Sequence, residues 1–298
     1  MTTSPKPEIR AFFDEPTNTV SYLVWDPATR AAAVIDPVLD YDHASGRVTT
    51  GSAEAVLTVA EALGLKIEWV LETHAHADHL TAAPFLKART GAKVGIGEHV
   101  TDVQAIFRPL FNAQDLTPDG RDFDALFKDG ETVALGELQI EVLHTPGHTP
   151  ACVSYRIGDA VFVGDTLFMP DYGTARTDFP GGNARSLYRS IRRLLDLPPQ
   201  TRLFMCHDYK APGRDRFAWE TTVAEERARS VHVHDGIGEE DFVAMRTARD
   251  ATLAAPNLLL PSVQVNMRGG RFPPPAANGQ RYLVTPVTVG EELTEVLA

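Results

Sequence analysis

The sequence contains the run Thr73-His74-Ala75-His76-Ala77-Asp78-His79, which ends the apolar and β-branched stretch 67–73. Four potential metal ligands therefore fall within six residues. In an extended strand the first two histidines point to one face, and a turn after them can bring the aspartate and the third histidine to the same point. The small alanines between them leave room for that turn. A surface loop that is merely rich in histidine is the ordinary alternative, but this spacing favours a metal site.

Three further candidates follow predicted strands later in the chain. His148 lies in Thr145-Pro146-Gly147-His148-Thr149, Asp165 ends the apolar stretch 161–165, and His207 ends the stretch 203–207. Each has an ordinary alternative as a turn residue, a helix cap or a core histidine. Together with the first run, they predict one metal centre at the rim of a layered sheet.

The order of the predicted elements indicates the fold class. Strand patterns and turn signals alternate twice with helical patterns, and the helix after Ser52 is expected to have that serine as its cap. We therefore expect a layered α/β sandwich with sheets inside and helices outside. The predicted strands are 20–25, 31–36, 67–73, 93–96, 132–135, 138–143, 152–157, 160–163 and 202–206, and the predicted helices are 52–63, 80–90 and 183–195.

The last 90 or so residues differ from the rest of the chain in composition and in the pattern of predicted elements. They contain charged helical patterns at 219–229 and 239–254, followed by a segment rich in proline and glycine at 256–279. We interpret them as an appendage of about 211–298 around a core of about 18–210, within one domain that covers 1–298. The apolar run 258–261 either packs on this core or buries against a second copy in a homodimer.

Composition excludes some partners. The chain has 298 residues, a formal net charge of −12 and no basic run longer than Arg192-Arg193, so nucleic acid and anionic membranes are poor candidate partners. Only two cysteines occur, Cys152 and Cys206, so no disulfide framework is expected, and both are expected to be buried. With no signal peptide or long apolar span, we expect a soluble cytoplasmic protein.

The ordered motifs H-x-H-x-D-H, P-G-H-T, G-D and a final histidine resemble the metallo-β-lactamase superfamily over roughly residues 18–210. This resemblance implies a four-layer αβ/βα sandwich with metal at the sheet rim. The C-terminal residues would then form a helical and extended appendage to that sandwich.

Within this superfamily the chain is similar to persulfide dioxygenases, and most of all to the bacterial β-lactamase-like hydrolase branch that is tied to sulfide detoxification. The similarity is carried by Gly173-Thr174-Ala175-Arg176-Thr177-Asp178-Phe179 and by His207-Asp208-Tyr209. It implies catalytic roles for Arg176, Asp178 and Tyr209. Many relatives have Cys-Gly where this chain has Thr174-Ala175, so no role of that cysteine transfers.

The resemblance also implies one Fe(II) per chain, held by His74, His148 and Asp165 with three positions open for sulfur and oxygen. The remaining residues of the set would be vestigial ligands or would orient the triad by hydrogen bonds. These are His76, Asp78, His79 and His207. The expected reaction oxidises glutathione persulfide, or a similar small persulfide, with O₂ to sulfite and thiol. Zinc is redox-inert and could not supply the electrons.

Two other functions remain open. A glyoxalase II-like thioester hydrolase would hold two zinc or mixed metal ions, with His74, His76 and His148 on one ion, Asp78, His79 and His207 on the other, and Asp165 bridging. A non-catalytic metal-binding or sulfide-sensing module would hold metal without turnover, but an unreactive site is usually closed.

An acidic protein that handles an anionic thiol needs cations near its pocket. The candidates are Arg176, Lys210, Arg214 and Arg268, although ordinary solvated surface charge is the alternative for each. Four other histidines lack ligand spacing and are expected at the surface. They are His43, His99, His232 and His234.

Overall fold

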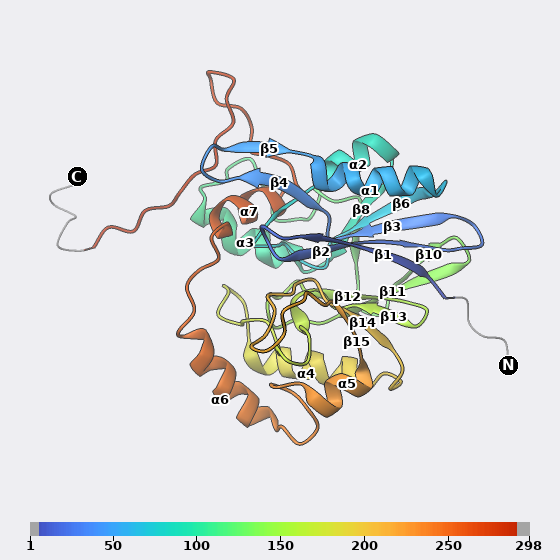
Figure 1. Cartoon of the computed structure of the whole chain (residues 1–298). Coiled ribbons are helices and arrows are strands. Elements are labelled where there is room, and N and C mark those ends of the chain that lie inside the picture. Colours follow the sequence, from blue (N-terminus) through green and yellow to red (C-terminus); the bar gives the residue numbers. More distant parts are fainter. Residues whose placement is uncertain (1–5, 291–298) are drawn as a thin grey trace.

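Strand β2 (Thr19–Trp25) shows how the layers arise, because its side chains are buried on both faces. Leu23 packs in an apolar cluster with helical residues, whereas Tyr22 and Val24 pack in the cluster between two sheets. This alternation follows from the period of two in a strand. A sheet that is apolar on both faces needs a cover on each side, and Figure 1 shows helices on one side and a second sheet on the other.

The structure is a computed structural model and describes residues 6–290. The first sheet has six strands, which lie in the order β1 (Glu8–Asp14), β2, β3 (Ala31–Ile35), β6 (Lys66–Leu71), β8 (Lys93–Gly97) and β9 (Ala125–Phe127). The first three strands pair antiparallel, and the pairs from β3 onward are parallel. Two strands that pair in parallel must be joined by a crossover connection. The three crossovers of this sheet contain the helices α1 (Gly51–Ala62), α2 (Ala83–Thr90) and α3 (Val100–Leu110).

The second sheet also has six strands, in the order β10 (Thr132–Leu135), β11 (Leu138–His144), β12 (Val153–Ile157), β13 (Ala160–Phe162), β14 (Arg202–Phe204) and β15 (Glu220–Thr222). Only β13 and β14 pair in parallel, and their crossover contains α4 (Ala184–Leu195). A small third sheet has the order β5 (Arg47–Thr49), β4 (Val38–Asp42) and β7 (Leu80–Thr81). The predicted α/β sandwich is thus confirmed.

Helix α4 shows why the outer layers stay in place. Asn183, predicted as the first helical residue, is its cap and accepts a hydrogen bond from the backbone N of Ser186 at 2.9 Å. Leu187, Ile191 and Leu194 are fully buried and share one face, because their spacing follows the helical period. This face packs with residues of β13 and β14 in one apolar cluster.

Several predicted elements need correction. The helix predicted at 80–90 begins at Ala83, because Leu80 and Thr81 pair with β4 instead. Ser52 is not the cap of α1; Thr50 precedes that helix, and the Ser52 hydroxyl donates to Asp40 at 2.5 Å.

The C-terminal part contains three helices. They are α5 (Val223–Arg229), α6 (Glu239–Asp250) and α7 (Leu259–Asn266). The pattern predicted as helix at 219–229 begins with strand β15, and α7 lies in the proline- and glycine-rich segment 256–279, where no helix was predicted. Leu259 and Leu260 are partly buried and pack against the chain's own core cluster, as the first of the two predicted alternatives has it. Among the described helices, none combines the length and hydropathy of a membrane span.

Candidate metal centre

The seven predicted ligands meet at one edge of the two sheets, although they come from four segments. The H-x-H-x-D-H run follows β6, and His148 lies in the turn between β11 and β12. Asp165 lies in the short 3-10 helix η1 (Gly164–Thr166). Asp165 and His207 each stand three residues beyond the last residue of their strands, so the predicted strands were too long.

Asp165 is the centre of the first group. Its Oδ2 lies 3.6 Å from His148 Nε2 and 3.9 Å from His74 Nε2. Ligand atoms of these three residues all lie within 4.8 Å of one another. Two imidazoles and one carboxylate at such spacing can hold a single transition-metal ion.

A second group stands beside the first. His76, Asp78 and His79 also offer ligand atoms within 4.8 Å of one another. His207 joins the two groups, because its Nε2 lies 3.5 Å from Asp78 Oδ2 and 3.2 Å from Asp165 Oδ1. The structure therefore brings all seven predicted ligands together.

Five buried polar atoms of this set have no hydrogen-bond partner among the described residues. They are Nε2 of His74, Nδ1 of His76, Nε2 of His79, Nε2 of His207 and Oδ1 of Asp165. Buried polar atoms are nearly always paired, so several unpaired acceptor atoms around one point call for a cation. Imidazole nitrogens and carboxylate oxygens suit zinc, iron and related ions. The residues present thus fit a metal centre.

Hydrogen bonds on the far side of the rings decide which nitrogen is free. His148 Nδ1 lies 2.8 Å from the carbonyl oxygen of Arg176, which can only accept, so Nε2 is left for a metal. His76 shows the reverse arrangement, because its Nε2 lies 2.9 Å from Asp36 Oδ1 and leaves Nδ1 free. Such outer partners fix ring orientation.

Asp36 also orients His74 through one intermediate. The hydroxyl of Thr73 donates to Asp36 Oδ2 at 2.8 Å and lies 3.0 Å from His74 Nδ1. One buried carboxylate therefore supports two neighbouring imidazoles. Asp36 was not identified as a site residue from the sequence. The pattern that identified the ligands was present, however, because Asp36 directly follows the apolar strand β3.

The surroundings shift the pKa values of His74 and His76 in opposite directions. Burial lowers the pKa of His74 well below its ordinary value, and the nearby histidines His76 and His148 lower it further. Burial also acts to lower the pKa of His76, but the carboxylates of Asp36 and Glu72 outweigh it and raise that pKa well above its ordinary value. A neutral His74 keeps its lone pair available to a cation.

Two glycines let the ligand turns approach their neighbours. Gly164 has φ +52°, and a Cβ there would lie 2.6 Å from the Thr73 hydroxyl. Gly147, just before His148, has φ +145°, and a Cβ there would clash with the backbone of Leu187 in α4. Glycine is needed at both points.

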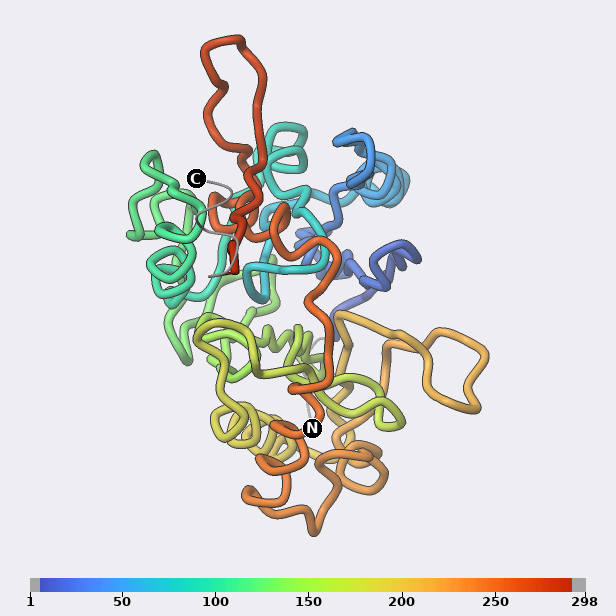
Figure 2. Tube along the Cα trace, turned by 90° about the vertical axis from the view of Figure 1, so that its left-hand side faces the viewer, coloured from blue at the N-terminus to red at the C-terminus, as the bar shows by residue number. Residues whose placement is uncertain are grey.

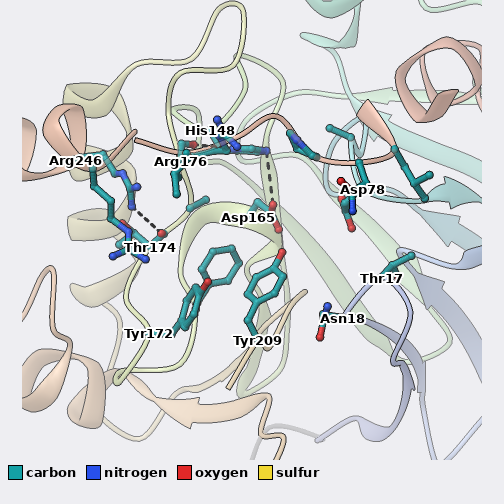
Figure 3. Close-up of a pocket in the computed structure, with 18 of the residues that line it drawn as sticks. Thr17, Asn18, Asp78, His148, Asp165, Tyr172, Thr174, Arg176, Tyr209 and Arg246 are labelled. Carbon is teal, nitrogen blue, oxygen red and sulfur yellow. Dashed lines mark hydrogen bonds and ion pairs between the residues drawn. The ribbon is translucent and has the colours of Figure 1, made fainter. Parts of the chain in front are cut away.

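A cavity of about 330 Å³ opens beside the ligands and is lined by His148, Asp165 and Asp78. This is the lower end of the size range of small-molecule sites. Figure 3 shows Arg246 and Thr174 on one side of it and Asp78 and Thr17 on the other.

The residues predicted as catalytic lie close to this cavity, but not all line it. Tyr209 lines it, stacks on His207 with ring centroids 5.7 Å apart, and points its hydroxyl toward Asp165 in Figure 3. Arg176 also lines it, but its guanidinium is bound by Asp178 at 2.6 Å. Asp178 is not part of the lining and acts on the cavity through Arg176.

The other cations predicted to bind substrate are engaged elsewhere, and none of them lines the cavity. Arg268 is buried and pairs with Asp115 at 3.0 Å. Arg214 pairs with Asp208 at 2.6 Å and with Asp171 at 2.7 Å. The ammonium of Lys210 lies 4.2 Å from the ring centre of Phe217. In this structure each of the three cations thus has a partner outside the cavity, and their predicted contact with substrate stays a prediction.

His232 also differs from its prediction as a surface residue. It is partly buried, and its Nδ1 accepts a hydrogen bond from the backbone N of Thr174 at 3.1 Å. Burial, followed by the positive charges of Arg246 and Arg249, lowers its pKa to about 4. His232 therefore supports the segment that lines the cavity. Both cysteines are free and buried, as predicted.

Two residues that matter to the site gave no local signal in the sequence. Asn266 in α7 donates from its amide to the carbonyl oxygens of His76 and His79, both at 2.8 Å. Arg249 in α6 lines the cavity. Both lie in the C-terminal part, and only the folded chain brings them to the centre.

Comparisons with known proteins agree with this geometry. The sequence profile of the Metallo-beta-lactamase superfamily matches residues 14–207. A probable metallo-hydrolase of Burkholderia pseudomallei (strain 1710b) is 57% identical over 290 residues, which cover 94% of this chain and 98% of that protein. The mitochondrial persulfide dioxygenase ETHE1 of Homo sapiens is 30% identical over 271 residues, which cover 90% of this chain and 91% of that protein.

A solved structure gives the same picture. The crystal structure of ETHE1 from Myxococcus xanthus matches with a TM-score of 0.71 and 34% identity, over 89% of this chain and 100% of that one. The chain spans 66% of the length of three bacterial relatives called beta-lactamase hydrolase-like proteins. The matched profile covers well over half of the chain, and the ligand set lies within it. The chain belongs to the metallo-beta-lactamase superfamily.

Proposed function

We propose that this protein is a persulfide dioxygenase with one Fe(II) per chain. The observation that carries the proposal is the group His74, His148 and Asp165, whose ligand atoms lie within 4.8 Å of one another. Two histidines and one carboxylate that leave positions open are typical of non-haem iron oxygenases. The likeness to ETHE1 proteins over about nine-tenths of the chain supports the same activity.

The proposed reaction is balanced with O₂ and water. The outer sulfur of the persulfide is oxidised, O₂ accepts four electrons, the S–S bond breaks, and one molecule of water adds the third oxygen of sulfite. The thiol leaves, and two protons are released. Bound Fe(II) would supply the redox chemistry that activates O₂.

The chain's own residues have positioning roles in this proposal. The carbonyl of Arg176 orients His148, and Asp36 orients His74 through Thr73. Tyr209 stands beside the ligands with its hydroxyl facing the cavity, where it can donate a hydrogen bond to an anionic sulfur or oxygen.

The test uses the full chain loaded anaerobically with Fe(II). We expect about one iron per chain, and uptake of one O₂ for each sulfite formed from glutathione persulfide. Asp165→Asn should lose both iron and O₂ uptake, whereas the exposed control Asp102→Asn should retain both. Absence of O₂ uptake by the iron-loaded protein would contradict the proposal.

One observation favours a second candidate, a dinuclear metal hydrolase of thioesters. His79 and His207 each have a buried unpaired Nε2 beside Asp78, so a second ion has ligands available. The name of the Burkholderia relative points the same way. Two bound zinc ions per chain, with thioester cleavage and no O₂ uptake, would favour this function.

A further inference from the structure

The wall of the cavity opposite Asp78 comes from the C-terminal part of the chain. Helix α6 contributes Arg246 and Arg249 to this wall. Leu253 and the segment 256–258, which follow the helix, also line the cavity. Figures 1 and 2 show the connection from α6 to α7 crossing from the lower half of the molecule to the upper half. The matched superfamily profile ends at residue 207, so these residues lie outside the region that it matches.

Three arginines line the cavity, and two of them are already neutralised. Arg246 is buried and pairs with Asp250 at 2.5 Å, and it also donates to the carbonyl oxygen of Thr174 at 3.1 Å. Arg176 pairs with Asp178. Such saturated guanidiniums shape the wall but have few donors left for a ligand.

Arg249 differs from both neighbours. It lines the same cavity and is exposed, and no carboxylate within residues 6–290 pairs with it. Arg246 and Arg249 stand three residues apart on α6, so they face the same side of the helix. Both charges act on His232, which lies next to the cavity lining. After burial, the positive charges of Arg246 and Arg249 are the largest causes of the lowered pKa of His232.

The cavity is therefore polarised. The metal-ligating carboxylates Asp78 and Asp165 lie in its lining, and Arg249 adds an uncompensated positive charge to the α6 wall. Apolar side chains of Phe168, Leu253 and Leu258 also line it. A molecule with a sulfur at the ligands and a carboxylate at the α6 wall would match this distribution.

We propose that Arg249 binds a carboxylate of the thiol that carries the persulfide sulfur, and so selects carboxylate-bearing carriers over neutral ones. The inference rests on the proposed function for the sulfur end of the ligand. A guanidinium can bind a carboxylate through two parallel hydrogen bonds, which gives both affinity and orientation. Arg249 is a specificity residue and takes no part in the redox step.

The kinetic test compares two persulfides on the iron-loaded full chain. Arg249→Gln should raise KM for glutathione persulfide about tenfold and leave kcat within about twofold, because the lost contact is remote from the sulfur. KM for the persulfide of 2-mercaptoethanol, which has no carboxylate, should not change. The matched control is Arg229→Gln, since Arg229 is exposed at the end of α5, has no ion pair with any described residue and lies outside the cavity lining.

A binding test separates this inference from the proposed reaction. On zinc-loaded protein, calorimetry should show tighter binding of glutathione than of its diethyl ester, and Arg249→Gln should remove that difference. An unchanged preference in the variant, or no preference in the wild type, would overturn the role of Arg249. If the wild type consumed no O₂ with either persulfide but Arg249→Gln abolished the preference, the reaction would be wrong and the carboxylate site right.

Discussion

Two buried carboxylates, Asp36 and Glu226, show how neighbouring charges and hydrogen-bond partners set the direction of a pKa shift. Asp36 accepts from the backbone N of Thr73 at 2.7 Å and lies close to His76. Burial acts to raise the pKa of Asp36, but the charge of His76 and these hydrogen bonds outweigh it and lower the pKa. Glu226 in α5 is equally buried, and neither of its oxygens has a partner among the described residues. Burial therefore raises the pKa of Glu226 to about 8.

Glu226 should make stability depend on pH. Between its ordinary value of 4.5 and about 8, the folded protein keeps a proton that the unfolded chain releases. Since the unfolded chain binds fewer protons in this window, the free energy of unfolding falls as pH rises. Glu226→Gln removes this titration, so its stability relative to the wild type should increase by about 2–4 kcal/mol from pH 5 to pH 8.

Chemical denaturation at both pH values measures this difference. The exposed residue Glu61 in α1 provides the control, because Glu61→Gln should leave the pH dependence of the wild type unchanged. A Glu226→Gln variant with the same pH dependence as the wild type would show that the carboxylate finds a partner or solvent that the structure does not reveal.

At the level of elements, α7 fixes the metal-binding loop. The amide of Asn266 donates to the carbonyl oxygens of His76 and His79, and its oxygen accepts from the backbone N of Thr81 at 2.9 Å. One side chain thus satisfies three buried backbone groups around the ligands. Backbone groups at such a depth need partners, so the loop depends on α7 for its conformation.

Replacing Asn266 by aspartate keeps the shape but removes both donors. We expect Asn266→Asp to lower the free energy of unfolding by about 2–4 kcal/mol, because two buried carbonyls lose their partners. Metal affinity should fall about 10–100-fold, since the ligands lose their support. Gln264→Glu is the control, because Gln264 is also in α7 but bonds Leu260 and Val284, and metal affinity should stay within about twofold. Equal metal affinities in both variants would argue against this role of α7.

The elements also show what the sequence can predict. Strands β2, β3 and β11 were predicted because each is an apolar run bounded by turn residues, and the ligands were predicted because they follow such runs. Helix α7 was missed because it contains a proline and is buried on all sides, so no amphipathic period is visible. Partners 153 residues apart, such as Arg268 and Asp115, depend on the folded chain and leave no local pattern.

At the scale of the whole molecule, the predicted appendage packs into the clusters that hold the sandwich together. Val223 and Phe242 pack with α4 and the second sheet. Val265 packs with the helices of the first sheet, and Val263 packs with α3. The C-terminal part therefore contacts both halves, which favours the prediction of one domain over a core that folds alone.

Truncation tests this prediction. A chain that ends at residue 255 loses Val263, Val265 and Met267, whose burial contributes about 1.5–3 kcal/mol each and so about 5–9 kcal/mol together. Because a whole domain is stable by only about 5–15 kcal/mol, we expect no cooperative unfolding transition in urea for this chain. A chain that ends at residue 285 keeps α7 and loses exposed side chains such as Val287, so its free energy of unfolding should stay within about 1 kcal/mol of the full chain. A chain ending at residue 255 that unfolded cooperatively and still bound metal would instead place the boundary of the folding unit before α7, and the support that Asn266 gives the ligands would then be dispensable.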